Sequence, residues 1–311
     1  MSVKHYNACP ACDSGSIRLV ESVETARIAE AWSKISATAK DALRTEIEGE
    51  NIPHQTQIYH CDRCQLEFAN PMYSALSDWY AEVEQYGIRW EFQQCLADIN
   101  PSSTLLEIGC GEGYFLELAM QAGHQTLGLD FNPKAIKIAQ AKGLNAQCWD
   151  LKKLGAQQQT FDRVAFFHVL EHIDDLDSFF ADLSALTTKD ASLHFSCPHP
   201  QRYTELIDYH RLGKREYWDY PPHHQTRWVP SAIEQLLNRL GWKLIKTMNE
   251  PFHWVGVSGY LARLKHEQQG QLFADLSPIR RKTAIVAQMM QTLIPSRHYS
   301  GISLYCVAVR A

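Results

Sequence analysis

The sequence predicts an α/β fold, an open and mostly parallel sheet with helices on both faces, preceded by a small cysteine-rich module. Three observations carry this prediction. Short apolar segments alternate with helical patterns from about residue 100 onward, which indicates β-α-β units. A glycine-rich turn follows the first of these segments directly. Two C-x-x-C pairs lie near the N-terminus.

Composition and charge narrow the class of protein. The chain has 311 residues, of which 45% are hydrophobic and 21% charged, and this excludes a disordered, collagen-like or coiled-coil chain. Its net charge of −5 argues against a dedicated nucleic-acid binder. The N-terminus has no apolar signal segment, and no stretch reaches the ~18 apolar residues of a membrane span. We therefore expect no membrane span and a cytoplasmic protein with reduced thiols.

The two cysteine pairs predict a metal site in a module over residues 1–75. Each spacing lets both thiolates of Cys9 and Cys12, and of Cys61 and Cys64, reach one tetrahedral ion. We expect a structural zinc ribbon, with unmetallated or redox cysteines as the alternative. A catalytic zinc is not expected, since four thiolates leave no open position. The module contains seven Lys and Arg against ten Asp and Glu, so it offers no basic surface for RNA.

The long gap between the two pairs is explained by an inserted helix. Apolar residues recur there at spacings of three and four, the pattern of one helix face. Gly49 and Pro53 mark its end. The residues of this face are Ile28, Trp32, Ile35, Ala39, Leu43 and Ile47.

The parallel sheet is predicted from five apolar segments. They are Thr104–Ile108, Thr126–Asp130, Ala146–Trp149, Phe161–Phe167 and Ser192–Ser196. The clearest helix between them is Pro133–Lys142, with Asn132 as N-cap and Gly143 just past its end. Ligands bind open α/β sheets beyond the carboxyl ends of the strands, so the site is expected there.

The turn after the first strand follows the pattern acid-x-Gly-x-Gly-x-Gly. Its residues are Glu107, Gly109, Gly111 and Gly113. The dinucleotide fingerprint would require a third glycine where Tyr114 stands, so a dinucleotide site fits poorly. The pattern resembles motif I of the class I S-adenosylmethionine (SAM) methyltransferases.

Three further pieces match this family in the same order. Asp130 ends the second strand, in the register of an acid that binds the ribose hydroxyls. The third strand ends at Asp150, which the resemblance assigns to the adenine. The segment FD…LEHI within Phe161–Ile173 resembles the fourth-strand motif. The resemblance implies a Rossmann-like fold, SAM as cofactor, and a binding set of Glu107, Gly109, Gly111, Gly113, Asp130, Phe131, Asp150, Leu151 and His168.

The same segment offers a competing motif. His168, Glu171 and His172 match the H-x-x-E-H of inverted zinc proteases. That chemistry needs both histidines on one helix face, whereas this segment leaves a predicted buried strand directly. We expect structural roles at the edge of the SAM pocket for both histidines.

The acceptor side is predicted in an aromatic, histidine-rich insertion at about residues 200–228. A base that titrates near neutrality suits proton removal from an acceptor, and His223, His224 and Tyr220 are the candidates. Positional catalysis without a dedicated base, and an ordinary packed insertion, are the alternatives. A second insertion at about 251–297 is expected to form a lid or a dimer surface.

The whole sequence is thus expected to hold a zinc ribbon over 1–75 and a SAM-binding methyltransferase domain over 76–311. It resembles zinc-ribbon methyltransferases of sugar, polysaccharide and secondary-metabolite pathways. We expect O- or N-methylation of a small molecule or glycan. An RNA or protein methyltransferase that docks through the ribbon is the main alternative. A non-catalytic SAM-fold subunit is a third one.

Overall fold

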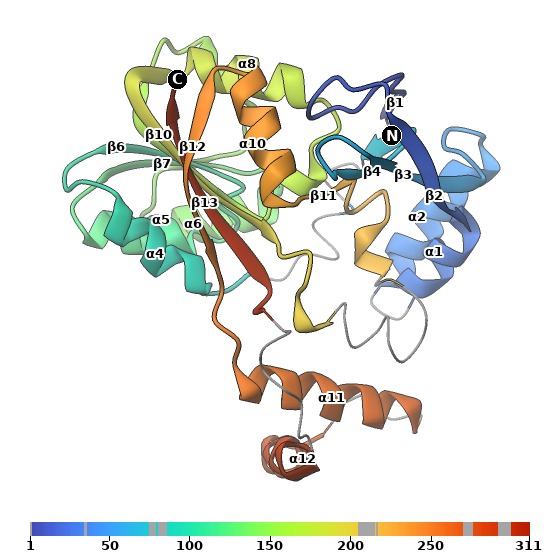
Figure 1. The fold of residues 1–311 in the computed structure, drawn as a ribbon. Coiled ribbons are helices and arrows are strands. Elements are labelled where there is room, and N and C mark those ends of the chain that lie inside the picture. Colours follow the sequence, from blue (N-terminus) through green and yellow to red (C-terminus); the bar gives the residue numbers. More distant parts are fainter. Residues whose placement is uncertain are drawn as a thin grey trace. The chain divides into compact units, whose positions relative to one another are not determined.

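The computed structural model of the chain describes residues 2–33, 36–74, 79, 86–204, 215, 217–269, 276–291 and 300–311. The chain divides into two units. The first, residues 1–198, 216–248 and 304–311, contains the N-terminal module and the large sheet (Figure 1). The second comprises residues 199–215 and 249–303. Residues 205–214, 216, 270–275 and 292–297 of the predicted insertions lie outside the described residues.

The large sheet has seven strands in the order β12-β13-β10-β9-β6-β7-β8. Neighbouring strands from β10 to β8 pair in parallel. The predicted parallel α/β sheet is therefore confirmed, and β6 and β9 have the predicted bounds. The strands are β6 (Thr104–Ile108), β7 (Gln125–Leu129), β8 (Ala146–Gln147), β9 (Phe161–Phe167), β10 (Thr187–Pro198), β12 (Trp242–Asn249) and β13 (Ser303–Arg310).

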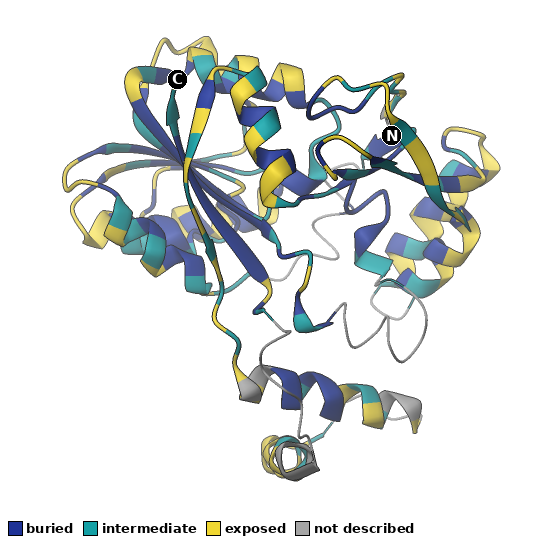
Figure 2. Ribbon diagram, in the orientation of Figure 1, coloured by how far each residue is buried: buried dark blue, intermediate teal, exposed yellow. Residues whose placement is uncertain are grey.

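Helices cover both faces of this sheet (Figure 1). One face carries α4 (Trp90–Asp98), α5 (Tyr114–Gln121) and α6 (Pro133–Ala141). The other carries α7 (Leu151–Gly155), α8 (Leu176–Ala185) and α10 (Pro230–Arg239). Figure 2 shows that the strands between the two helical layers are mostly buried.

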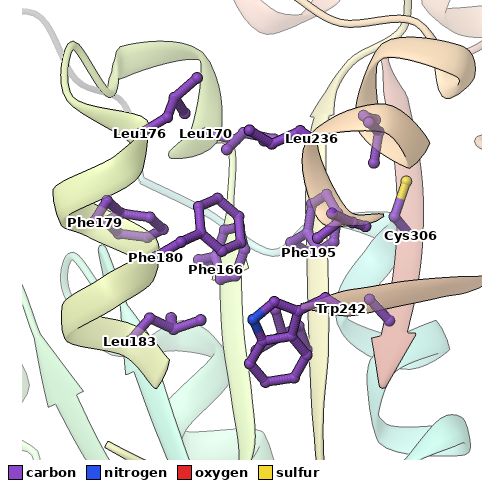
Figure 3. Packing of buried hydrophobic residues seen from close by; sticks show 14 of the residues in the cluster. Phe166, Leu170, Leu176, Phe179, Phe180, Leu183, Phe195, Leu236, Trp242 and Cys306 are labelled. Atoms are coloured by element: carbon purple, nitrogen blue, oxygen red, sulfur yellow. The ribbon is translucent and has the colours of Figure 1, made fainter. Parts of the chain in front are cut away.

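Two adjacent phenylalanines of β9 pack against the helices on opposite faces of the sheet. Phe166 stacks on Phe195 of β10 at 4.8 Å between ring centroids, under α8 (Figure 3). Phe167 packs instead against Phe92 of α4 and Phe115 of α5, at 5.0 and 4.9 Å. Successive side chains of a strand point to opposite faces, so an unbroken apolar run indicates a strand buried on both sides.

The local signals for helix ends are confirmed in α6. Asn132 caps the helix, and its side-chain oxygen accepts hydrogen bonds from the Lys134 and Ala135 amides at 3.0 and 3.4 Å. Pro133 occupies the first helical position, where its missing N–H is no loss. Gly143 adopts a φ of 79° just after the helix ends.

The N-terminal module is built on a four-stranded sheet of order β11-β4-β3-β2. Its strands are β2 (Ile17–Glu24), β3 (Gln55–Cys61), β4 (Glu67–Ala69) and β11 (Thr226–Arg227). A smaller sheet pairs β1 (Ser2–Lys4) with β5 (Met72–Ser74). Strand β11 belongs to the predicted aromatic insertion and pairs antiparallel with β4. The insertion therefore completes the module's sheet.

The segment between the cysteine pairs forms two helices, so the prediction of a single helix is wrong. Helix α1 spans Thr25–Trp32 and α2 spans Ala37–Glu48. Ser36 has an extended backbone, and its hydroxyl accepts a hydrogen bond from the Ala39 amide at 3.1 Å. A serine in this role starts a new helix, and periodicity alone does not reveal it because both helices bury their apolar residues in one cluster.

Aromatic residues of the insertion pack against this module. The Trp32 ring is fully buried and lies 5.2 Å from the ring of Tyr217 and 5.0 Å from that of Trp218. Trp79 contacts Trp32 from another side, at 5.1 Å. For Tyr217 and Trp218 the structure thus shows the packed insertion that was one alternative to an acceptor site.

Gln225 joins the module to the large sheet. Its backbone N–H donates to the Glu171 carbonyl at 2.7 Å, and its backbone carbonyl accepts from Ala69 N–H at 2.8 Å. Its side-chain amide bonds the backbone of Tyr73 in both directions, at 3.0 and 3.1 Å. The residue is 1% exposed, and an amide with this many partners fixes the segments around it.

The second unit contains α11 (Trp254–Gln268) and α12 (Pro278–Gln291). Within the unit, the Glu250 carboxylate accepts from the amides of Ile302 and Ser303 at 2.7 and 3.0 Å. A lid, a dimer surface and a homo-oligomer stay predictions. Over the described ranges, every helix falls short of the length and hydropathy of a membrane span.

A buried histidine makes the stability of the sheet depend on pH. His194 on β10 is 1% exposed and bonds Ser192 Oγ and Tyr305 Oη at 2.8 and 3.0 Å. Burial lowers its pKa from 6.5 to about 4. As the pH falls through this interval, the unfolded chain takes up a proton that the folded chain does not, so stability is lost.

We expect His194→Gln to reduce the dependence of the free energy of unfolding on pH. The free energy of unfolding of the unmodified protein should fall by up to about 3 kcal/mol from this group as the pH drops from 6.5 to about 4. Urea unfolding across that interval measures the slope for both proteins. An equal slope in the variant would show that His194 is not the group responsible.

Candidate active site

A cavity of about 410 Å³ opens at the carboxyl ends of β6, β7 and β9. This is where ligands bind open α/β sheets. Most of the predicted cofactor residues line it, namely Glu107, Gly109, Asp130, Phe131, Asp150, Leu151 and His168. The structure thus brings together residues from four separate chain segments. Gly111 and Gly113 belong to the same turn but are not among the lining residues.

The glycine turn leaves no room for side chains. Gly109 has a φ of 76°, and a Cβ there would lie 2.6 Å from Cγ2 of Val169. Gly111 has a φ of 52°, and a Cβ there would collide with the Tyr86 ring. Left-handed backbone at these positions favours glycine. The turn therefore presents bare backbone beside the cavity.

Asp130 is held rigidly at the end of β7. Its Oδ2 accepts the Gly111 N–H at 2.8 Å, and its Oδ1 accepts the Asn132 N–H at 2.7 Å. Each carboxylate oxygen can accept a second hydrogen bond. The side chain lines the cavity in a fixed orientation, which suits two neighbouring hydroxyl donors such as those of a ribose.

Glu107 places a second acid at the same end of the cavity. It is 3% exposed, and its Oε2 has no hydrogen-bond partner in the part of the chain that the structure describes. Burial, and next the charge of Asp130, raise its pKa well above the usual range. A buried carboxyl oxygen without a donor favours a ligand with cationic and N–H groups. SAM carries both cationic groups and ribose hydroxyls, so this end of the cavity fits it.

The third predicted acid, Asp150, has a structural role as well. It caps α7, and its Oδ1 accepts the Lys153 N–H at 2.7 Å. It also lines the cavity, together with the rings of Trp149 and Phe131. These rings offer apolar surface on which a base could pack. The assignment of Asp150 to the adenine stays a prediction.

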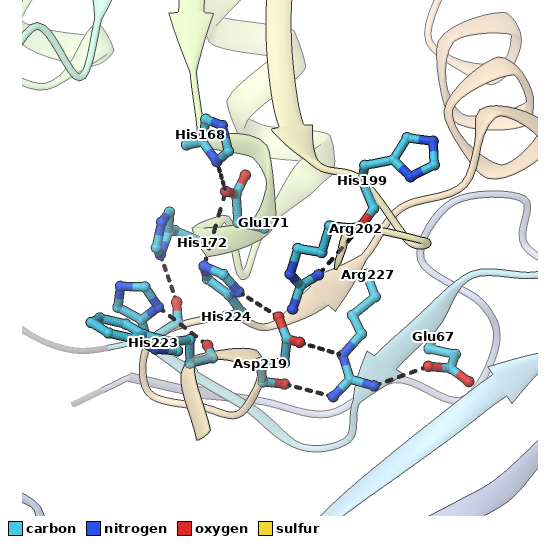
Figure 4. Close-up of polar contacts among 11 residues, drawn as sticks. Glu67, His168, Glu171, His172, His199, Arg202, Asp219, His223, His224 and Arg227 are labelled. Atoms are coloured by element: carbon cyan, nitrogen blue, oxygen red, sulfur yellow. Dashed lines mark hydrogen bonds and ion pairs between the residues drawn. The ribbon is translucent and has the colours of Figure 1, made fainter. Parts of the chain in front are cut away.

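His168 lies between two buried carboxylates. Its Nε2 is 3.3 Å from Glu91 Oε1, and its Nδ1 is 3.3 Å from Glu171 Oε1 (Figure 4 shows the second pair). Burial alone would lower its pKa, but the two carboxylates outweigh burial and raise it. Burial alone would raise the pKa of each carboxyl, yet His168 brings both to about 2. His168 is therefore a donor rather than a proton acceptor.

The backbone of His168 is also unusual. Its φ is 52°, in a region that residues other than glycine seldom adopt and that often marks a constrained site. The turn after β9 then enters the short helix η1 (Leu170–His172). This turn directs His168 and His172 to the cavity, where both are lining residues.

The candidate bases lie behind the cavity wall. His223 and His224 are 6% and 8% exposed and are not lining residues, whereas His172 is one. The three imidazole rings contact one another, with centroids 4.4 to 5.0 Å apart. The Tyr220 hydroxyl donates to Glu21 Oε1 at 2.6 Å, and this residue is also not a lining residue. A catalytic role for His223, His224 and Tyr220 stays a prediction.

The four cysteines of the module form one buried cluster. Their sulfur atoms all lie within 4.8 Å of one another, with 3.5 Å between Cys9 and Cys64 and 3.6 Å between Cys12 and Cys61. Tetrahedral coordination at a Zn–S distance of ~2.3 Å separates sulfur atoms by about 3.8 Å. The donor set therefore fits zinc.

Helix α10 binds the two cysteine loops directly. Arg239 donates to the carbonyls of Pro10 and Ala11, at 2.7 and 3.2 Å. The Ser231 hydroxyl donates to the Cys64 carbonyl at 2.9 Å. The cysteine cluster is thus attached to the helix layer of the large sheet.

Comparison with known proteins agrees with this geometry. A family model described as a methyltransferase domain matches residues 80–247, which is more than half of the chain. The chain belongs to this methyltransferase family. The predicted class I SAM-dependent methyltransferase, with its Rossmann-like sheet, is confirmed.

Curated relatives carry a more specific description. The "Ubiquinone biosynthesis O-methyltransferase" of Coxiella burnetii is 30% identical over 159 residues, which cover 48% of this chain and 67% of the relative. The protein of the same description from Bordetella avium is 30% identical over 116 residues, 35% of this chain and 48% of the relative. The methyltransferase thus spans between about half and two thirds of the length of these relatives.

Among solved structures, a SAM-dependent methyltransferase from Archaeoglobus fulgidus is similar to this chain. The two are 19% identical with a TM-score of 0.46, over 71% of this chain and 91% of the other.

Sequence reasoning missed several residues of the site. Glu91 and Tyr86 lie ahead of the glycine turn, outside every recognisable motif. The Ser196 hydroxyl donates to Glu91 at 3.0 Å, which buries this acid beside β10. Tyr86 contacts the glycine turn and accepts from Asn132 Nδ2 at 3.1 Å. The one sequence feature that could have indicated Glu91 is its position as an acid between the apolar residues Trp90 and Phe92.

We expect Asp130→Asn to weaken binding of the demethylated cofactor S-adenosylhomocysteine by about 10- to 100-fold. The amide keeps the shape of the side chain but replaces one acceptor by a donor, and a hydrogen bond to a charged group contributes about 1.5–3 kcal/mol. Isothermal titration calorimetry measures the affinity. Asp190→Asn, at an exposed position of β10, is the matched control. Unchanged affinity in the Asp130 variant would contradict the ribose assignment.

Proposed function

We propose that this methyltransferase transfers a methyl group from SAM to an oxygen of a small-molecule acceptor. The observation that carries the proposal is the pairing of buried Glu107 with the rigid Asp130 beside the glycine turn. The descriptions of the curated relatives as O-methyltransferases support oxygen as the methylated atom. The acidic count of residues 1–75 supports a small molecule over RNA.

The residues at the two ends of the cavity would have different roles. Glu107, Asp130 and the glycine turn would hold SAM, which supplies an activated methyl group when bound. His168 and its carboxylates would order the wall next to the turn after β9. The aromatic lining would exclude water from the reacting atoms once both ligands are bound. His172 lines the same cavity and would adjoin the acceptor.

The proposal is tested by following a labelled methyl group. The protein is incubated with labelled SAM and a cell extract separated into low-mass compounds, RNA and protein. Label in low-mass compounds, and its loss with Asp130→Asn, is the expected result. Label in RNA or protein would instead support the alternative of macromolecular methylation. Mass spectrometry of the labelled product then separates glycans from other acceptors.

We also propose that the cysteine cluster holds one structural zinc ion. The sulfur distances and the complete burial of Cys9, Cys61 and Cys64 support this assignment. Four thiolates close the coordination sphere, so the ion would stabilise the module and would not take part in methyl transfer. Its effect would reach α10 through Ser231 and Arg239.

Cys61→Ser should reduce the zinc content from about one ion per chain toward zero and lower the melting temperature. Metal analysis after gel filtration measures the first, and thermal unfolding measures the second. Cys148→Ser removes an exposed thiol outside the cluster and serves as control. Equal zinc content in both variants would refute the assignment.

A further inference from the structure

A second group of potential metal ligands lies behind the cavity wall. His172 ends η1, while His223 and His224 follow the short helix η2 (Tyr217–Asp219). One ring nitrogen of each histidine lies within 4.8 Å of one from each of the others. All three residues belong to the first unit. Three nitrogen donors that converge in this way match the spacing of ligands around one ion.

The hydrogen bonds of these histidines fix which nitrogen is the donor to a metal. Nδ1 of His172 lies 2.6 Å from the His223 carbonyl, and Nδ1 of His223 lies 3.2 Å from the Trp218 carbonyl (Figure 4). A carbonyl oxygen only accepts, so both Nδ1 atoms carry the proton. Each Nε2 then carries the lone pair. Histidines that bind metals hold their second nitrogen in this manner.

His224 follows the same rule with a carboxylate. Its Nδ1 lies 3.0 Å from Oδ1 of Asp219, which is 3% exposed. Arg227 in turn donates to the Asp219 carbonyl at 3.1 Å. The carboxylate therefore acts as the outer partner of an imidazole, the arrangement that orients a histidine toward a metal.

Glu171 adds an oxygen donor to the three nitrogens. It is 1% exposed, its Oε1 lies 3.3 Å from Nδ1 of His168, and its Oε2 makes no hydrogen bond within the described residues. Its Oε1 lies 4.0 Å from Nε2 of His224. His168 balances part of the charge of this carboxylate, and a bound cation would compensate the second oxygen, which is costly to bury without a hydrogen bond. This second observation also points to an ion at the cluster.

We propose that His172, His223, His224 and Glu171 form a binding site for a divalent transition-metal ion, distinct from the cysteine cluster. Packing alone explains why the His223 ring lies 5.3 Å from Trp32, but it does not explain three imidazole nitrogens within 4.8 Å of one another. With the protons on Nδ1, the Nε2 atoms cannot donate to one another. Three imidazoles and one carboxylate select zinc, cobalt, nickel or iron over magnesium and calcium.

The position of the site gives the ion a role that rests on the proposed function. His172 lines the cavity, so the ion would be close to the acceptor. A metal that binds a hydroxyl oxygen lowers the pKa of that hydroxyl. The proton is released to solvent, and the oxygen forms its bond to the methyl group as the methyl–sulfur bond of SAM breaks. While the Nε2 atoms bind the ion they do not act as bases.

The site is tested with Co²⁺ as a probe on protein that already holds zinc in the cysteine cluster. We expect one further metal ion per chain, with the weak visible bands of nitrogen and oxygen ligands and without the intense thiolate band. His224→Gln and Glu171→Gln should each weaken Co²⁺ binding at least tenfold. His54→Gln, at an exposed position of the module, should leave it unchanged.

Two further measurements keep the outcomes distinct. Zinc content and S-adenosylhomocysteine affinity show whether a variant is folded. If His224→Gln or Glu171→Gln does not fold, His172→Gln is used in its place. No second ion, or equal Co²⁺ affinity in all cluster variants, would overturn the proposal. Second-ion binding without methyl transfer would keep the site and refute the proposed function. Methyl transfer without a second ion would refute the site alone.

Discussion

The arrangement of the site depends on the backbone pairing made by Gln225. Through Ala69 and Tyr73 this residue is part of the N-terminal sheet, and through the Glu171 carbonyl it is bonded to the turn after β9. Its amide is buried with its hydrogen-bonding groups engaged, so any displacement would leave polar groups unpaired. The two histidines just before it are thereby held next to His172. A segment distant in sequence reaches the cavity wall because β11 must pair with β4.

The two ends of the cavity differ in their electrostatics. Around the glycine turn, Glu107 and Asp130 line the cavity, one with a buried oxygen that has no donor among the described residues and the other fixed by amides. At the turn after β9, His168 lies between two carboxylates that raise its pKa and balance their charge with its own. The first end therefore suits a cationic ligand, whereas the carboxylates at the second end already have a histidine partner.

The sequence predicts those parts of the fold that local patterns govern. The apolar run of β9, the Asn132 cap and the glycine turn follow from side-chain type and spacing alone, and all are found. The division into α1 and α2 depended on one hydroxyl, that of Ser36, which periodicity does not register. Glu91 and Gln225 have no local signal, because their partners Ser196, His168 and Ala69 become neighbours only when the chain has folded.

The contacts of α10 with the cysteine loops make the N-terminal module and the large sheet difficult to separate. Arg239 and Ser231 bond to the backbone of both loops, and β11 supplies an edge strand to the module's sheet. A fragment that begins after the module would expose Trp228 and the underside of α10, and an isolated module would lack a strand. The N-terminal module and the large sheet therefore depend on each other, and replacing the module would require matching changes more than a hundred residues downstream, at Ser231 and Arg239.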